Sequence, residues 1–212
     1  MRIFQRKKGM TLIELLLAIA VTGIVMQAFT YFFIRTWDTN KYILELGLAS
    51  AMAHRANNKI IIDLRGIQQS DHGAFPIAEA TSMSLTIYSD IEDDGTVERV
   101  RYYLDQASDE LRVGITNPDT STQPATYPSG DQETRVLARH VVNASNDPIF
   151  YYYNDDYPGD TTANPLVLPT SLANIQLVKI KLYVNIDPIR APNNVYMESF
   201  VDLRNLHYYE SS

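Results

Sequence analysis

Residues 7–35 read KKGMTLIELLLAIAVTGIVMQAFTYFFIR, and this stretch decides how the rest of the chain is arranged. Between Met10 and Ile34 the only formal charge is Glu14. As a helix, residues 10–34 would be roughly 37 Å long, which exceeds the ~30 Å hydrocarbon core of a bilayer. We therefore predict that residues 10–34 form a transmembrane helix.

Positive charge is concentrated just before this segment. Arg35 is the only cation directly after it, whereas four cations precede Gly9, namely Arg2, Arg6, Lys7 and Lys8. Because cationic flanks stay on the cytoplasmic side, we expect the N-terminus inside and the body outside the inner (cytoplasmic) membrane. A cleaved secretory signal is disfavoured, because the apolar run is too long and no cleavage site with small residues follows it.

The part of the chain after Gly9 is acidic. It carries 14 of the 18 cationic residues and all 25 acidic ones, a net charge of -11. Such a surface repels phosphate, so we expect no nucleic acid to be bound by the bulk surface. The chain has no cysteine, its four histidines are scattered, and it has no P-loop, dinucleotide or hydrolase motif. We therefore expect no enzyme, no metal site of zinc type and no cofactor.

Glu14 is the costly residue of the apolar segment. A carboxylate costs up to ~3 kcal/mol at the bilayer centre and less near its edge, so a plain membrane anchor gains nothing from one. If the chain is cut between Gly9 and Met10, a cationic α-amine appears four residues before Glu14 and attracts it strongly at low dielectric. The amine of the same chain or of a neighbouring subunit can supply this charge. Alternatively, Glu14 reaches the headgroups and interacts with the helix dipole.

These residues resemble the processing motif of type IV pilins and of the pseudopilins of type II secretion. The motif combines a basic leader ending in Gly9, a threonine second and a glutamate fifth after the glycine, and a long apolar run. The resemblance implies that residues 1–9 are a cytoplasmic leader and that a membrane aspartyl prepilin peptidase cleaves after Gly9. It also implies N-methylation of Met10, where phenylalanine is commoner in the family, and a role of Glu14 in subunit assembly.

An apolar pattern continues beyond the membrane segment in steps of three and four, which predicts an amphipathic helix over residues 35–67. Gly66 is the expected stop. The predicted buried face consists of Tyr42, Leu46, Ala49, Ala53, Ala56, Ile60, Leu64 and Ile67. The predicted solvated face consists of Lys41, Glu45, Ser50, Arg55, Asn58 and Lys59.

Residues 68–212 are predicted to form an exported β-rich globular domain. Segments rich in β-branched and aromatic residues, several of them alternating, indicate antiparallel strands at 82–90, 97–105, 110–115, 135–142, 148–154, 174–186 and 194–203. The expected fold is α+β, with one long N-terminal helix, transmembrane in its first half and amphipathic in its second, packed on an antiparallel β-sheet domain. This arrangement is pilin-like.

Two polar stretches and one acidic stretch lie within this domain. Residues 114–134 and 154–171 are predicted loops, used either for recognition or as tolerated insertions, and insertion is favoured. Asp90, Glu92 and Asp94 approximate the start of an EF-hand, but Arg101 stands where a bidentate glutamate is needed. A β-hairpin with Asp94 and Gly95 at its turn is the favoured interpretation. Calcium held by Asp90, Asp93 and Asp94 is a separate hypothesis.

Two functions stay open. The segments DIEDDGTVERVRYYLD (90–105), PIFYYYN (148–154) and FVDLRNL (200–206) resemble segments of minor pilins and of the J-type minor pseudopilin. The resemblance implies a structural subunit that leaves the inner membrane lipid and primes or joins a type IV pilus or secretion pseudopilus, with other pilin subunits as partners through its N-terminal helix. The alternative is a single-pass membrane-anchored extracytoplasmic binding domain that does not polymerise.

Overall fold

The structure is a computed structural model that describes residues 9–186 and 194–208, with side chains described up to residue 206. The cationic leader residues before Gly9 lie outside the described residues. The chain divides into two compact units, Met1–Glu45 and Leu46–Ser212, which are described separately.

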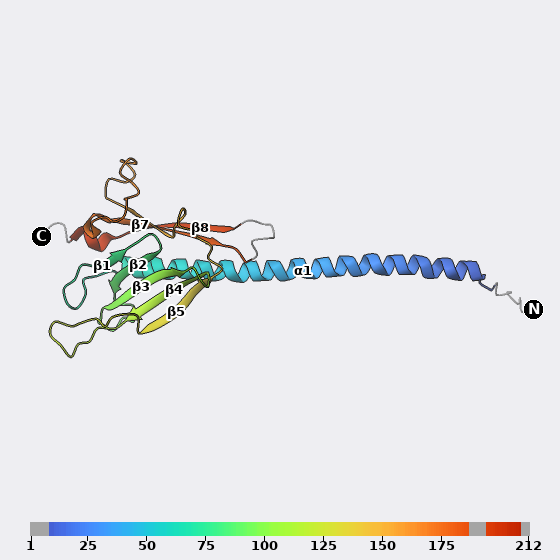
Figure 1. The fold of residues 1–212 in the computed structure, drawn as a ribbon, viewed down its shortest axis with the longest axis horizontal. Helices are drawn as coiled ribbons and strands as arrows, with labels where there is room; N and C mark the ends of the chain where they lie inside the picture. Colours follow the sequence, from blue (N-terminus) through green and yellow to red (C-terminus); the bar gives the residue numbers. More distant parts are fainter. Residues whose placement is uncertain (1–8, 187–193, 209–212) are drawn as a thin grey trace, which may run out of the picture. The chain divides into compact units, whose positions relative to one another are not determined.

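One uninterrupted helix, α1 (Leu12–Arg65), forms the first unit from Leu12 onward and the start of the second (Figure 1). From Leu15 to Ile34 its side chains are exposed and carry no charge on any side, and α1 is long and apolar enough to cross a membrane. Its threonine hydroxyls are satisfied locally, since the Thr22 hydroxyl donates to the Ala18 carbonyl oxygen at 2.7 Å and the Thr30 hydroxyl to that of Met26 at 2.9 Å. These bonds let hydroxyl residues sit in an apolar helix at little cost.

The second part of α1 buries one face, as the sequence predicts. Six residues of the predicted face are buried, namely Ala49, Ala53, Ala56, Ile60, Leu64 and Ile67. The three alanines allow close approach of neighbouring backbones because their side chains are short. The helix ends before Gly66, whose amide donates to the carbonyls of Ile62 and Asp63, both at 3.1 Å. The stop at Gly66 is therefore confirmed, while Tyr42 and Leu46 of the predicted face are only half-buried and Ile67 lies beyond the helix.

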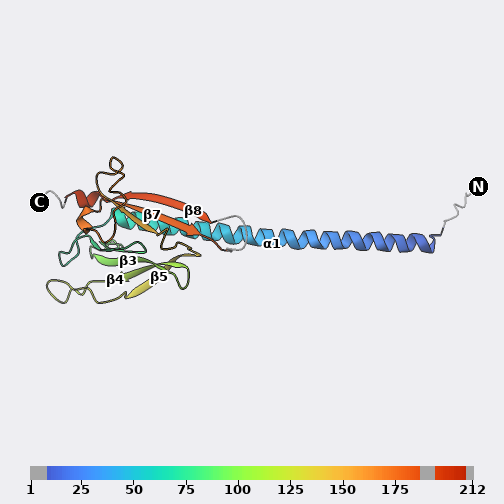
Figure 2. The same cartoon turned by 45° about the horizontal axis from the view of Figure 1, so that its top comes forward.

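Two antiparallel sheets make up the body (Figures 1 and 2). The five-stranded sheet has the order β1-β2-β3-β4-β5, and the three-stranded sheet has the order β6-β7-β8. The strands are β1 (Ile77–Ala80), β2 (Ser84–Ser89), β3 (Glu98–Asp105), β4 (Glu110–Thr116), β5 (Glu133–Arg139), β6 (Phe150–Tyr153), β7 (Leu177–Val184) and β8 (Val195–Asp202). Every strand predicted from the sequence is present, and only the short β1 was missed.

The second part of α1 lies between these two sheets, with β7 and β8 on one side and β3 to β5 on the other (Figures 1 and 2). Contacts to both sheets agree with this view. The Asn57 side-chain amide donates to the Ser199 hydroxyl of β8 at 2.8 Å, and Asp63 accepts a hydrogen bond from Tyr102 of β3. The α+β fold with one long helix packed on antiparallel sheets is thus confirmed.

A buried polar node joins the helix to the five-stranded sheet. Asp63 is 4% exposed and accepts hydrogen bonds from the Tyr102 hydroxyl and from Lys59 Nζ, the latter at 2.8 Å. Burial first, and then the negative charge of Asp63, raises the pKa of Tyr102 well above its ordinary value. Because a buried carboxylate is costly without donors, the node favours one register of α1 against β3.

The outer face of the three-stranded sheet carries lysines between aromatic rings. Lys181 Nζ bonds Asp147 Oδ1 at 2.6 Å and lies within 6 Å of the ring centres of Tyr151, Tyr183 and Tyr196. The Tyr151 hydroxyl donates to the same carboxylate at 2.8 Å. The predicted alternation of β7 is confirmed, because its odd-numbered residues, such as Lys181, face out while its even-numbered ones are buried.

The loop between β4 and β5 is tied to the outer face of the five-stranded sheet. Arg99 Nη2 donates to the carbonyl oxygens of Pro128 at 2.6 Å and Gly130 at 2.9 Å, and Arg101 forms an ion pair with Asp131 at 2.5 Å. Gly114 makes this approach possible, because a side chain at that position would overlap the Asp131 carboxylate. The part of the loop just before β5, residues 128–131, is therefore held against the sheet, while residues 119–124 are exposed.

The loop within residues 154–171 is also anchored. Asn164 is buried and donates through Nδ2 to Asn154 Oδ1 at 2.6 Å and to the Asp160 carbonyl oxygen at 2.9 Å. The Tyr157 ring stacks on Phe200 of β8, with an interplanar angle of 14°. Both long loops thus have specific contacts to the sheets, and their role stays open between recognition and insertion.

Candidate functional site

The start of α1 is a capping box. The amide and the hydroxyl of Thr11 both donate to Glu14 Oε2, at 3.0 and 3.1 Å, and the Glu14 amide donates to Thr11 Oγ1 at 3.3 Å. Thr11 occupies the N-cap position and Glu14 the third helical position, so each side chain satisfies the other's backbone amide. These bonds account for the start of the helix at Leu12.

Gly9 and Met10 lie just outside this helix. Both are exposed, and neither has helical backbone. A side chain at Gly9 would meet no atom of the described chain within 4 Å. The described part of the molecule therefore gives no steric reason for glycine at this position.

The structure places the three predicted site residues Gly9, Met10 and Glu14 at one end of α1, and it adds Thr11 to them. Sequence reasoning assigned no contact to Thr11. The signal for it is present, because threonine followed three residues later by glutamate, before an apolar run, is typical of a capping box. Glu14 therefore has local donors in the uncut chain. Its pairing with an α-amine, and the processing roles of Gly9 and Met10, stay predictions.

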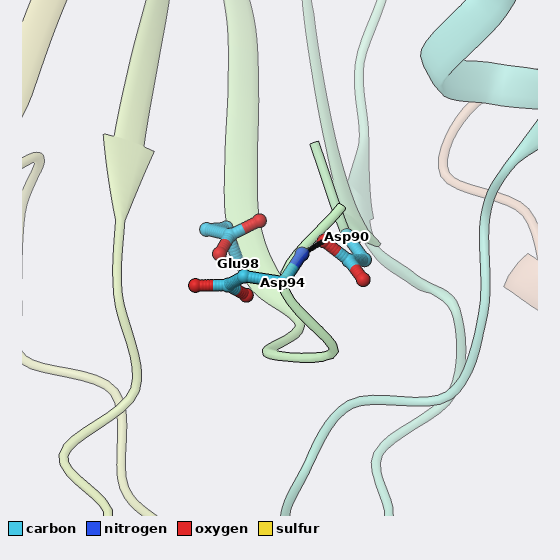
Figure 3. Close-up of side chains that lie close together, drawn as sticks. All are labelled: Asp90, Asp94 and Glu98. Carbon is cyan, nitrogen blue, oxygen red and sulfur yellow. Dashed lines mark hydrogen bonds between the residues drawn. The ribbon is translucent and has the colours of Figure 1, made fainter. Parts of the chain in front are cut away.

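The acidic stretch forms the predicted β-hairpin between β2 and β3, closed by the pair Ser89 and Glu98. Carboxylate oxygens of Asp90, Asp94 and Glu98 all lie within 4.8 Å of one another (Figure 3). Asp93 is exposed, has a positive φ of 57° and is not in this group. The group thus contains two of the three aspartates named in the calcium hypothesis, with Glu98 instead of Asp93.

Hydrogen bonds within the hairpin explain why these carboxylates converge. Asp90 accepts from the amides of Asp94 at 3.2 Å and Gly95 at 2.9 Å, and Glu98 Oε2 accepts from the Ile91 amide at 2.9 Å. Burial raises the pKa of Glu98, the Ile91 amide opposes this, and the charges of Asp90 and Asp94 raise it further. The turn itself accounts for the cluster, and calcium binding stays a hypothesis.

Comparison with known proteins identifies one segment. Residues 4–26 match the family model of the prokaryotic N-terminal methylation motif. No curated protein and no solved structure matches the chain. The matched segment contains Gly9, Met10 and Glu14 and covers the capping box and the first turns of α1. The chain therefore carries the N-terminal methylation motif, which supports its place among the type IV pilins and pseudopilins.

Proposed function

We propose that this chain is a minor pilin or minor pseudopilin, a structural subunit that prepilin peptidase processes and that primes or joins a type IV pilus or a type II secretion pseudopilus. The observation that carries the proposal is the methylation motif over residues 4–26, at the start of a helix that is apolar on every side and long enough to cross a membrane. The resemblance of the body segments to minor subunits supports the finer assignment.

Processing begins at the exposed, non-helical bond between Gly9 and Met10. Before cleavage, the cationic leader keeps the N-terminus on the cytoplasmic side of the inner membrane, and residues 10–34 hold the chain in the lipid. Hydrolysis consumes one water, releases residues 1–9 with a new carboxylate at Gly9, and leaves a cationic α-amine on Met10, which is then methylated. The acidic body stays outside the membrane.

Assembly uses the charges at the new N-terminus. Glu14 accepts two hydrogen bonds from Thr11 in the uncut chain, and cleavage adds an α-amine one residue before Thr11. In a filament, the amine of one subunit neutralises Glu14 of its neighbour, which sets the register between the two helices. Packing between apolar helices then replaces contact with lipid and supplies most of the assembly free energy.

Mass spectrometry of the membrane-extracted protein tests the processing step. Loss of residues 1–9 together with the gain of one methyl group is the expected result. An intact leader would instead favour the anchored binding domain that does not polymerise.

Variants at Glu14 test the assembly step. Glu14→Gln keeps a side-chain oxygen for the Thr11 bonds but removes the charge, so we expect it to lose filament incorporation as Glu14→Ala does, while the body stays folded. Glu45→Ala is the matched control, because Glu45 is an exposed carboxylate of the same helix whose partner Lys41 lies at 3.8 Å. Normal filament yield with Glu14→Gln would refute the pairing of Glu14 with an amine.

A further inference from the structure

A stripe of apolar and cationic side chains, three of them exposed and two half-buried, runs along α1 within the body. Steps of four and three residues place its members on one face of the helix, and the stripe consists of Leu48, Met52, Arg55, Lys59 and Ile62. Leu48 and Ile62 are each 65% exposed, although the neighbouring face of the same helix is fully buried. The sequence predicts only polar residues for this outer face, so its apolar members are a finding of the structure.

A groove adjoins the stripe between α1 and strand β5. It has a volume of ≈ 420 Å³ and is lined by Met52, Arg55, Ala56, Lys59, Val136 and Leu137. β5 is the last strand of its sheet, and no other strand of the described chain pairs with its outer side. The groove therefore combines apolar side chains from two elements with two cations.

Arg55 is the exposed cation of this groove. Its Nε donates to the Ala51 carbonyl oxygen at 3.3 Å, and it forms no ion pair with any described residue. Lys59 differs, because it pairs with the buried Asp63 at 2.8 Å. A lone arginine between exposed apolar residues, on a body of net negative charge, has the composition of a protein interface, where arginine is enriched.

We infer that the stripe and groove receive the acidic hairpin, residues 91–95, of a second copy of this chain. This inference rests on the proposed filament function. The hairpin supplies the complementary chemistry, because its exposed carboxylates Glu92, Asp93 and Asp94 adjoin the half-buried Ile91. Opposite charges beside apolar surface on the two patches give both attraction and specificity.

The contact joins two different patches of the same chain, so it is heterologous: it gives an open array when the rotation between copies does not close, and a ring when it does. Ser89, where the hairpin begins, bridges Ile67 at the end of α1. Arg55 lies within α1, well before its end at Arg65, so a copy whose hairpin docks beside Arg55 is displaced along the helix relative to its neighbour. A stagger of this kind extends a filament and does not close a dimer.

An anionic bilayer is the competing occupant of a cationic and apolar helix face. The groove is concave and includes β5, and the acidic body repels an anionic surface. These observations favour the protein partner, and binding to lipid is an outcome that the experiment distinguishes.

The absence of cysteine makes disulfide crosslinking a direct test. Chains carrying either Asn58→Cys, beside the stripe, or Glu92→Cys are extracted from the membrane in detergent after cleavage behind Gly9, mixed and oxidised. We expect the mixed 58 to 92 crosslink to exceed both homodimers. Arg55→Glu should reduce it at least about tenfold, and Asp93→Arg in the other copy should restore it. Arg204→Glu, which changes an exposed arginine outside the groove, should leave the crosslink unchanged.

A second crosslink separates the two ways in which the experiment can fail. Leu16→Cys reports assembly through the N-terminal helix alone. If residue 16 crosslinks between copies while residues 58 and 92 do not, the body contact is overturned and the proposed function stands. If neither crosslink forms, the body contact and the proposed function both fail. Binding to phosphatidylglycerol vesicles is measured as well. If Arg55→Glu weakens this binding and no crosslink forms between residues 58 and 92, the stripe binds lipid and the inference is overturned. If circular dichroism shows that Arg55→Glu perturbs the fold, Ile62→Ser replaces it, since Ile62 is exposed.

Discussion

Removing one hydroxyl from Tyr102 tests the polar node that joins α1 to the five-stranded sheet. Tyr102 is 0% exposed and Asp63 4% exposed, so water cannot replace the donor that Tyr102→Phe removes. One carboxylate oxygen of Asp63 then keeps its bond from Lys59 at 2.8 Å, while the other loses its bond from Tyr102. A hydrogen bond to a charged group contributes about 1.5–3 kcal/mol, so the variant should be destabilised by that amount.

Tyr152→Phe is a matched control for this variant. Tyr152 is equally buried, and its hydroxyl donates to a neutral acceptor, the Thr81 carbonyl oxygen, at 2.6 Å. The volume removed is the same, but a bond between neutral groups contributes only about 1 kcal/mol. The difference between the two variants therefore isolates the charge of the acceptor.

Thermal unfolding of the full-length protein in detergent, followed by near-UV circular dichroism, measures both variants. At about 2–4 °C per kcal/mol for a body of this size, we expect Tm to fall by roughly 3–12 °C for Tyr102→Phe and by roughly 2–4 °C for Tyr152→Phe. A double-mutant cycle with Asp63→Asn should show coupling of about 1–3 kcal/mol with Tyr102→Phe. Equal losses of Tm in the two variants, or zero coupling in the cycle, would refute the node as the feature that sets the helix register.

Three further variants test the loop, the hairpin and the sheet face. Gly114→Ala should displace the Asp131 carboxylate and release the β4 to β5 loop, so limited proteolysis of that loop should speed up while Tm changes little. Glu98→Gln should have a higher Tm than wild type at neutral pH, and the two Tm values should converge near pH ~4. The reason is that the pKa of Glu98 is raised in the folded chain, so wild type loses stability as pH rises above the ordinary glutamate pKa. Calcium that raises only the wild-type Tm would support the cation hypothesis. Asp147→Asn should lose less stability in acid than wild type does. Partial burial opposes ionisation of Asp147, but hydrogen bonds from Lys181 and two tyrosines lower its pKa. The stability that the Asp147 carboxylate contributes is therefore present above about pH 3.9 and is lost as pH falls below it.

Elements with a local pattern could be predicted from the sequence. The buried face of α1 follows steps of three and four, and the burial of β7 follows strict alternation, so both were found without tertiary information. β1 was missed because its four residues, IAEA, include only one β-branched and no aromatic residue, whereas β6, which is equally short, was found from its aromatic run FYYY. The cap formed by Thr11 was not predicted, although threonine three residues before glutamate is a local signal for it.

The sequence by itself determined the long helix, its exit from the membrane segment, the strand-rich body and the processing motif, because each depends on residues that are near one another along the chain. Only the tertiary structure decided which distant side chains meet. Asp63 and Tyr102 are 39 residues apart, Asn57 and Ser199 are 142 apart, and neither pair follows from composition or period. The same holds for the stripe on α1, whose apolar residues are left in water because the two sheets cover other faces of the helix. Side-chain contacts between elements depend on how those elements pack and in which register, and a pattern within one element carries no information about either.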